Sequence, residues 1–196
     1  MPKGADTKSA IAAAAAPLFN QRGFAGTSMS DIMAATGLRK GAIYNHFASK
    51  DDIALAALEH GIGLIRARLD TALEGKESAR DRLNAIASVF ASHVDDPLIP
   101  GGCPLFNTAA DGDDSHPALS EKAREALDRW HTLVKGTVRK GIARGELRAG
   151  ADADAFATLF IAALEGGIVL SRMHGDDRHM RRIREALERE IDRMAA

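Results

Sequence analysis

"TSMSDIMAATGLRKGAIYNHFASKDDI", residues 27–53, carries the start and stop signals of two short helices and ends in the first turn of a third. Ser28 and Asp31 have the spacing of a capping box, which marks a helix start. Gly37 is placed to end that helix, because glycine readily adopts the left-handed conformation that closes a helix. A second short helix is predicted over residues 39–46. Short helices joined by such tight turns predict a helix-turn-helix motif.

The rest of the chain also favours helices. Of 196 residues, 45% are apolar and only 5% aromatic, and the apolar residues are mainly Ala, Leu and Ile. These residues lose little conformational freedom in a helix, whereas strands favour β-branched and aromatic residues. The predicted fold is all-α, with about nine helices and no strand. Besides the two short helices, the predicted ranges are 7–22, 49–73, 78–94, 105–110, 117–145, 152–174 and 177–194.

Charge is distributed unevenly along the chain. Residues 1–50 contain six Lys or Arg and two Asp, whereas residues 51–196 contain 20 basic and 25 acidic residues. A basic head on an acidic body suits a head that meets a polyanion. No uninterrupted apolar run reaches the roughly 18 residues needed to cross a bilayer, and no secretory signal is recognisable. One cysteine cannot form an internal disulfide. We therefore expect a cytoplasmic protein without a membrane partner.

The second short helix has the composition of a DNA-reading helix. In a helix-turn-helix, the first residues of the second helix face base edges in the major groove. Here these residues are Arg39, Lys40, Gly41 and Ala42. Arg and Lys donate to guanine acceptors or phosphates, and glycine permits close approach of the backbone.

Neighbouring residues extend this surface. Tyr44 and His46 can donate to phosphate oxygens, and Thr27 and Lys50 lie at the starts of the flanking helices, where helix dipoles favour phosphate. Ile43 and Phe47 instead have the spacing of core residues.

Residues 27–53, with "FNQRGFAGTS" before them, resemble the DNA-binding head of TetR/AcrR-type transcriptional regulators. The resemblance implies an all-helical homodimeric repressor that binds a double-stranded operator and is released by a small-molecule inducer. It implies a helix-turn-helix DNA-binding domain at 1–52 and a ligand-binding and dimerisation domain at 53–196. Arg39 departs from the commonest residue at its position, a serine that caps the helix. The residues expected to contact DNA are Thr27, Ser28, Arg39, Lys40, Gly41, Ala42, Tyr44, Asn45, His46 and Lys50.

The predicted last two helices suggest how two chains associate. Ala162, Ala163, Gly166 and Gly167 form a patch of small residues that permits close helix packing. With the apolar stripe of the helix over 177–194, this patch suits a two-fold dimer interface. The alternative is close packing within one subunit.

Several residues of the body are candidates for an inducer pocket. An apolar pocket with a few polar groups is typical of small-molecule sites. The candidates are Phe90, His93, Cys103, Phe106, Trp130, His131 and Phe160. Cys103 also permits a second hypothesis, a thiol-based sensor of electrophiles or oxidants, because it precedes the start of a predicted helix. The alternative is that Cys103 is a small buried residue of the core.

The sequence offers little support for an enzyme or a metal site. An enzyme would use Cys103 with His93 or His131, but the chain has no nucleophile elbow, phosphate loop or metal-ligand spacing. "HGDDRH" (174–179) fits a helix stop followed by a cap, and "DGDDSHP" (111–117) lacks EF-hand spacing. We expect no enzymatic activity, no cofactor and no metal. A DNA-binding activator or architectural protein without a ligand is the remaining rival.

Overall fold

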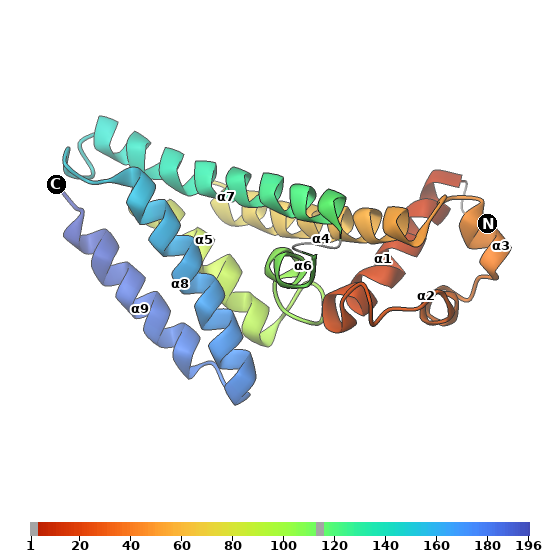
Figure 1. The fold of residues 1–196 in the computed structure, drawn as a ribbon. Coiled ribbons are helices and arrows are strands. Elements are labelled where there is room, and N and C mark those ends of the chain that lie inside the picture. The colour runs from red at the N-terminus through yellow and green to blue at the C-terminus, as the bar shows by residue number, and fades with distance from the viewer. Residues whose placement is uncertain (1–3, 113–115) are drawn as a thin grey trace. The chain divides into compact units, whose positions relative to one another are not determined.

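A computed structural model describes residues 4–112 and 116–196, so residues 113–115 of the predicted loop at 111–117 lie outside the described part. The described part is helical, as predicted, and its only strand-like pairing is an isolated bridge between Leu147 and Ala195 (Figure 1). Its nine helices are α1 Gly4–Arg22, α2 Met29–Thr36, α3 Lys40–Tyr44, α4 Lys50–Leu73, α5 Ala79–Asp95, α6 Pro104–Gly112, α7 Pro117–Ala143, α8 Ala153–His174 and α9 Arg178–Arg193.

The helix boundaries follow the capping signals. Ser28 accepts a hydrogen bond from the backbone N–H of Asp31, and the Asp31 carboxylate accepts one from the backbone N–H of Ser28. This reciprocal pair is the predicted capping box. Gly37 ends α2 with φ of 67°, in the left-handed region. The Asp152 side chain caps the start of α8 by accepting hydrogen bonds from the backbone N–H groups of Asp154 and Ala155.

The chain divides into two compact units. The first comprises the described parts of Met1–Ile65 and Leu98–Ala126, and the second comprises Arg66–Pro97 and Leu127–Ala196. The first unit therefore contains, besides the helix-turn-helix, the first part of α4, all of α6 and the first turns of α7.

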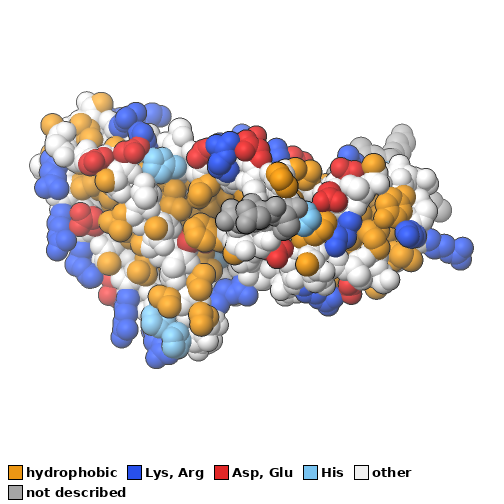
Figure 2. Space-filling view, in the orientation of Figure 1, with side chains coloured by type: hydrophobic (Ala, Val, Ile, Leu, Met, Phe, Trp, Pro, Cys, Tyr) orange, Lys and Arg blue, Asp and Glu red, His pale blue; other side chains and the backbone are white. Residues whose placement is uncertain are grey.

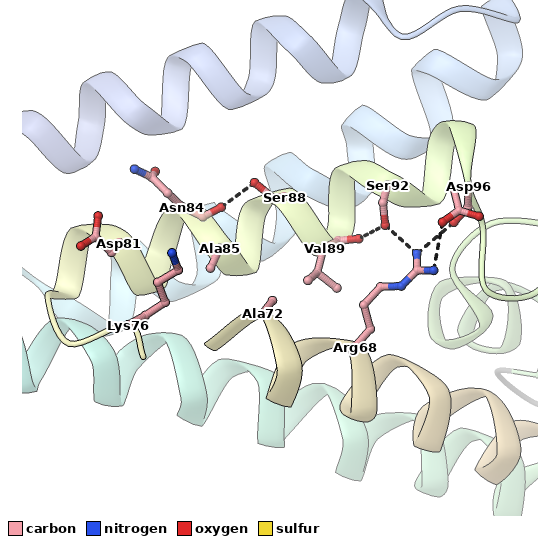
Figure 3. A pocket seen from close by; sticks show the side chains of 10 residues that line it. All are labelled: Arg68, Ala72, Lys76, Asp81, Asn84, Ala85, Ser88, Val89, Ser92 and Asp96. Carbon is pink, nitrogen blue, oxygen red and sulfur yellow. Dashed lines mark hydrogen bonds and ion pairs between the residues drawn. The ribbon is translucent and has the colours of Figure 1, made fainter. Parts of the chain in front are cut away.

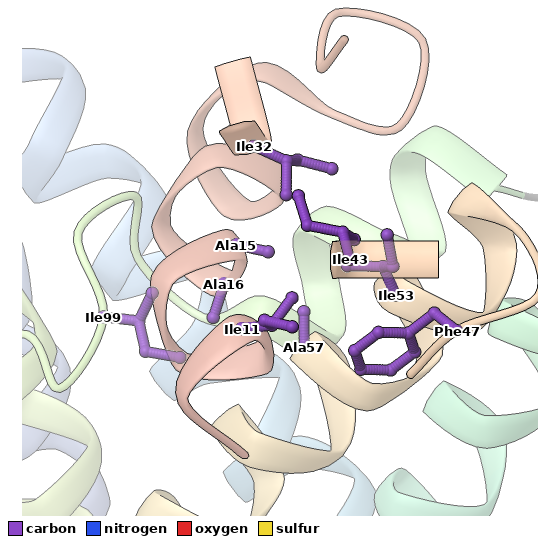
Figure 4. Close-up of a cluster of buried hydrophobic side chains, with 9 residues drawn as sticks. All are labelled: Ile11, Ala15, Ala16, Ile32, Ile43, Phe47, Ile53, Ala57 and Ile99. Carbon is purple, nitrogen blue, oxygen red and sulfur yellow. The ribbon is translucent and has the colours of Figure 1, made fainter. Parts of the chain in front are cut away.

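The core of the first unit holds the three head helices together. In it, α1 packs against α2 and α6, and α2 packs against α3. Side chains from α1, α2, α3 and α4 converge there with one from the turn between α3 and α4 and one from the loop before α6 (Figure 4). The buried residues are Ile11, Ala15, Ala16, Ile32, Ile43, Phe47, Ile53, Ala57 and Ile99. Ile43 and Phe47 are thus core residues, as their spacing predicted.

In the second unit α5, α8 and α9 pack against one another. By length and composition, α8 is apolar enough to cross a membrane, although no uninterrupted apolar run indicated this. Half of its most apolar window is buried within the fold. The apolar character of α8 is thus used in part for packing against α5 and α9.

Candidate nucleic-acid interface

Helix α3 is attached to its unit by one face and exposes the other. Ile43 is fully buried and Phe47 is 4% exposed. Because Ile43 anchors α3 and Phe47 anchors the turn that follows it, most side chains between and before them point outward. Arg39, Lys40, Gly41, Tyr44 and Asn45 are exposed, and Ala42 and His46 are half-buried.

The exposed polar side chains of α3 are not used to hold the fold. Arg39 occupies the N-cap position in an extended conformation, and its side chain makes no capping hydrogen bond. The Lys40 amine lies 5.8 Å from the centre of the Tyr44 ring. Among the described residues, the side chains of Arg39, Lys40 and Asn45 have no hydrogen bond or ion pair. These donors are therefore available to a partner.

Gly41 has no structural reason to be glycine. A Cβ atom built on Gly41 would meet no heavy atom of the described residues within 4 Å, and the φ of Gly41 does not lie in the left-handed region. Glycine lowers helix stability relative to alanine by about 0.5–1 kcal/mol. The open space in front of Gly41 is instead what close approach by an external molecule requires.

Two of the residues predicted to contact phosphate are engaged inside the head. Thr27 is fully buried, and its hydroxyl donates to the Gly23 carbonyl at 2.8 Å. The Lys50 amine donates to the carbonyls of Phe24 and Thr27, at 2.8 and 2.9 Å, and lies 4.0 Å from the centre of the Phe24 ring. Both side chains therefore stabilise the turn between α1 and α2.

Ser28 is exposed and is occupied with the start of α2. Its hydroxyl lies 2.6 Å from the Asp31 carboxylate and donates to it. This bond, with the one from the Ser28 backbone, holds the pKa of the Asp31 carboxyl below its ordinary value. Arg22 pairs with the same carboxylate at 2.9 Å. Asp31 is thus ionised at neutral pH and fixes the α1–α2 corner.

The same corner is tied to α6 by contacts that the sequence did not indicate. The Asp111 carboxylate accepts a hydrogen bond from the Phe24 backbone at 2.6 Å. The Asn107 amide donates to both the backbone and the side-chain oxygen of Asn20, at 3.1 and 2.9 Å. The ring of His116 lies 3.7 Å from that of Phe24. Residues of α6, together with His116 just before α7, thereby constrain the position of the α1–α2 turn.

Three of the predicted ligand-binding residues form one cluster in the second unit. Phe90 and Trp130 meet edge to face with ring centres 4.7 Å apart, and His93 lies 6.1 Å from Phe90. His93 is 2% exposed, and its Nδ1 lies 3.0 Å from the Val89 carbonyl, whereas its Nε2 has no partner among the described residues. Burial lowers the pKa of His93, so the ring is neutral at neutral pH.

The other predicted ligand-binding residues are more dispersed. Phe160 is fully buried beside Phe156, whose ring centre is 5.6 Å away. The ring of His131 lies near the surface, where its Nε2 is 3.3 Å from the Thr158 hydroxyl. In the first unit, Phe106 is 36% exposed and Cys103 is 3% exposed.

An open groove of about 560 Å³ runs between α4 and α5 in the second unit (Figure 3). Its one arginine, Arg68, already has hydrogen-bond partners within the protein. The guanidinium donates to the Ser92 hydroxyl at 2.9 Å and to the Asp96 carboxylate at 3.0 Å. Since its acids and bases are balanced, this groove offers no strong preference for a charged ligand.

Two family models match this chain. One, for bacterial regulatory proteins of the tetR family, matches residues 11–57. The other, for the tetracyclin repressor-like C-terminal domain, matches residues 79–187.

Individual proteins are similar over most of the chain. The transcriptional repressor NemR of Escherichia coli is 30% identical over 71% of this chain and 69% of its own length. A TetR transcriptional regulator from Chloroflexus aurantiacus is 42% identical with a TM-score of 0.95, over 100% of this chain and 98% of that one. CifR, solved with a 26-bp double-strand operator DNA, is 25% identical with a TM-score of 0.81, over 92% and 94% of the two chains.

Proposed function

Because the chain belongs to the TetR family of bacterial transcriptional regulators, we propose that it represses transcription as a homodimer bound to a pseudo-palindromic operator and is released by a small-molecule inducer. Members of this family are DNA-binding regulators and not enzymes, so an enzyme built on Cys103 is excluded. The domains proposed for these two activities are residues 1–52 for DNA and 53–196 for the ligand and the dimer.

The exposed face of α3 is the observation that carries operator binding. Arg39, Lys40 and Asn45 present donors that no described residue uses, and Gly41 leaves the backbone between them uncovered. In this motif, contacts to phosphates position the protein and contacts to base edges specify the sequence. We assign base contacts to Arg39, Gly41, Ala42 and Asn45, and phosphate contacts to Lys40, Tyr44 and His46.

Lys50 serves both the turn and the DNA in this proposal. A lysine amine has three donors, and two of those of Lys50 are used by the carbonyls of Phe24 and Thr27. The third remains for a phosphate oxygen. Thr27 and Ser28 contribute by shaping the start of α2, where backbone N–H groups favour phosphate.

The exposed face of α8 supports the homodimer. Leu159, Val169, Leu170 and Met173 are 53%, 49%, 43% and 79% exposed, and they share one side of the helix. Figure 2 shows hydrophobic side chains gathered over α8, with Lys and Arg along the outer edge over α9. An exposed apolar patch of this kind marks an interaction surface, and burial of such a face is the main favourable contribution to stable association.

The sequence left two explanations for the small residues of α8, a dimer interface and close packing within one subunit, and the two glycines differ in this respect. A Cβ on Gly167 would lie 3.0 Å from the Met180 side chain, so this glycine serves packing of α8 on α9 within one chain. A Cβ on Gly166 would meet nothing within 4 Å, so this glycine lies on the open face with the exposed leucines. We assign Gly166 to the dimer interface.

Release by an inducer requires that the ligand favour a conformation that no longer fits the operator. In a two-fold dimer the recognition helices must lie about 34–36 Å apart to enter successive major grooves. A ligand that binds better to another spacing weakens operator affinity, and by linkage the operator weakens the ligand equally. We propose that Phe90, His93 and Trp130 form part of the inducer site.

Size-exclusion chromatography with light scattering tests the dimer. We expect a mass of about twice the 20.8 kDa of one chain. Leu170→Glu places a charge in the proposed interface and should give a monomer with much weaker operator binding. Ala149→Glu, at an exposed site outside α8, is the matched control and should remain a dimer. A wild-type monomer on the operator would contradict the proposal.

A further inference from the structure

A second hollow in the second unit, of about 400 Å³, is bounded by the loop between α4 and α5, the first turn of α5 and the last turns of α7. Its volume lies within the range of small-molecule sites. It is lined by Lys76, Glu77, Ala79, Arg82, Thr137, Lys140, Gly141 and Arg144.

The lining has four cationic side chains and one acidic side chain. Lys76 and Lys140 have no side-chain hydrogen bond or ion pair among the described residues. Arg82 donates only to a backbone carbonyl, that of Lys76, at 3.1 Å. Arg144 donates to the Glu77 carbonyl at 2.7 Å and lies 3.7 Å from the Glu146 carboxylate. The positive charge of this hollow is therefore poorly compensated by the protein itself.

The hollow depends on close approach of α5 and α7. A Cβ on Gly141 would lie 2.6 Å from the Cβ of Ala79 and 2.9 Å from the Leu147 side chain, so a larger residue would separate the two helices. At the rim, the backbone N–H of Ala79 donates to the Glu146 carboxylate at 2.6 Å. The start of α5 thus already holds one carboxylate, which also lies near Arg144, whereas Lys76, Arg82 and Lys140 make no contact with it.

We propose that this hollow binds a small, multiply charged phosphorylated metabolite. Phosphate groups match the two planar guanidinium groups, which can donate in pairs, and the two lysines supply further point charges. A concave site of this volume suits a small molecule with two or more phosphate groups. The inference does not depend on operator binding, since every residue of the site lies in the second unit.

Inorganic pyrophosphate is the probe for the test, measured by isothermal titration calorimetry on the full chain at constant ionic strength. The test variant is the double substitution Lys76→Ala/Lys140→Ala. Because neither side chain has a partner among the residues that the structure describes, we expect its melting temperature to match that of the wild type. The control is Arg66→Ala/Arg189→Ala, which removes the same charge from two exposed positions of the same unit.

We expect one pyrophosphate per chain. The test variant should lose at least roughly tenfold in affinity, because the loss of even one charge-assisted hydrogen bond corresponds to about that factor. The control variant should bind as the wild type does. Absence of binding in the wild type, or equal loss in both variants, would overturn the proposal. Citrate is the second ligand arm, and citrate binding as tight as pyrophosphate binding would overturn the assignment to phosphate.

Discussion

Replacement of Gly41 by alanine separates the stability of α3 from its contact with DNA. The added methyl group would meet no heavy atom of the described protein within 4 Å, and the backbone at this position is accessible to alanine. The substitution therefore has no steric cost within the protein. If the glycine serves DNA approach, its replacement should improve stability and weaken operator binding.

The gain in stability can be estimated from helix propensity. Alanine is favoured over glycine in a helix interior by about 0.5–1 kcal/mol, partly through the entropy of the unfolded chain. Since Gly41 lies near the start of the short helix α3, we expect the lower end, about 0.5 kcal/mol. For a protein of this size that corresponds to a rise in melting temperature of roughly 1–2 °C.

The loss in operator affinity should be larger. A methyl group on the DNA-facing side would hold α3 away from the groove and lengthen the hydrogen bonds made by its neighbours. We expect at least a tenfold rise in Kd, which corresponds to about 1.4 kcal/mol. Fluorescence anisotropy with a labelled operator duplex measures this, with the duplex obtained by selection from random DNA and the salt concentration held fixed.

Gly63→Ala is the matched control for this experiment. Gly63 is exposed within α4, and a Cβ there would also meet nothing within 4 Å. We expect this variant to be stabilised by up to about 1 kcal/mol, with operator affinity unchanged. Wild-type affinity in Gly41→Ala would refute the assignment of Gly41 to the DNA interface. A fall in its stability would refute the conclusion that the space around it is open.

Four further outcomes are expected. Lys40→Ala should leave stability unchanged, weaken binding to all sequences alike and reduce the slope of log K against log salt by about 1; an unchanged slope would exclude a phosphate contact. Lys50→Ala should destabilise the head as well as weaken binding, by roughly 1–3 kcal/mol in the free energy of unfolding, because two part-buried carbonyls lose a charged donor; an unchanged urea unfolding curve would exclude this role. Burial lowers the pKa of His93, so the imidazole takes up a proton in the unfolded chain at a higher pH than in the folded protein. The free energy of unfolding should therefore decline below about pH 6.5, by at most ~1.4 kcal/mol per pH unit. His93→Gln should flatten the matching decline in melting temperature. Cys103, at 3% exposure, should react slowly with a maleimide in the folded protein and quickly in urea; equal rates would instead support a thiol-based sensor.

Local signals predicted the head well. The ends of α2 are set by interactions between near neighbours, those of Ser28, Asp31 and Gly37. These helix boundaries could therefore be predicted from the sequence alone. Ile43 and Phe47 are four residues apart, a spacing that predicts one shared face, and both are buried although Phe47 lies in the turn after α3. Arg39 occupies the N-cap of α3 without a capping bond, as its departure from serine predicted.

Contacts between distant residues could not be predicted in this way. The carbonyls that accept from the Lys50 amine lie 26 and 23 positions earlier in the chain, and Asn20 is 87 positions from Asn107. Which face of α6 or α7 a lone aromatic residue occupies is likewise decided by tertiary packing. The sequence therefore could not place Phe106, which is 36% exposed, and its assignment to an inducer site stays a prediction.

Selection of binding sites from random DNA tests both operator recognition and base reading by Arg39, with the wild-type protein and Arg39→Ala compared side by side. We expect the wild type to enrich a pseudo-palindrome whose half-sites lie about one helical turn, or a multiple of it, apart. We expect Arg39→Ala to lose preference at one symmetric pair of positions within the same palindrome. An identical motif from both proteins would contradict base reading by Arg39, and failure of the wild type to enrich any motif would contradict operator recognition itself.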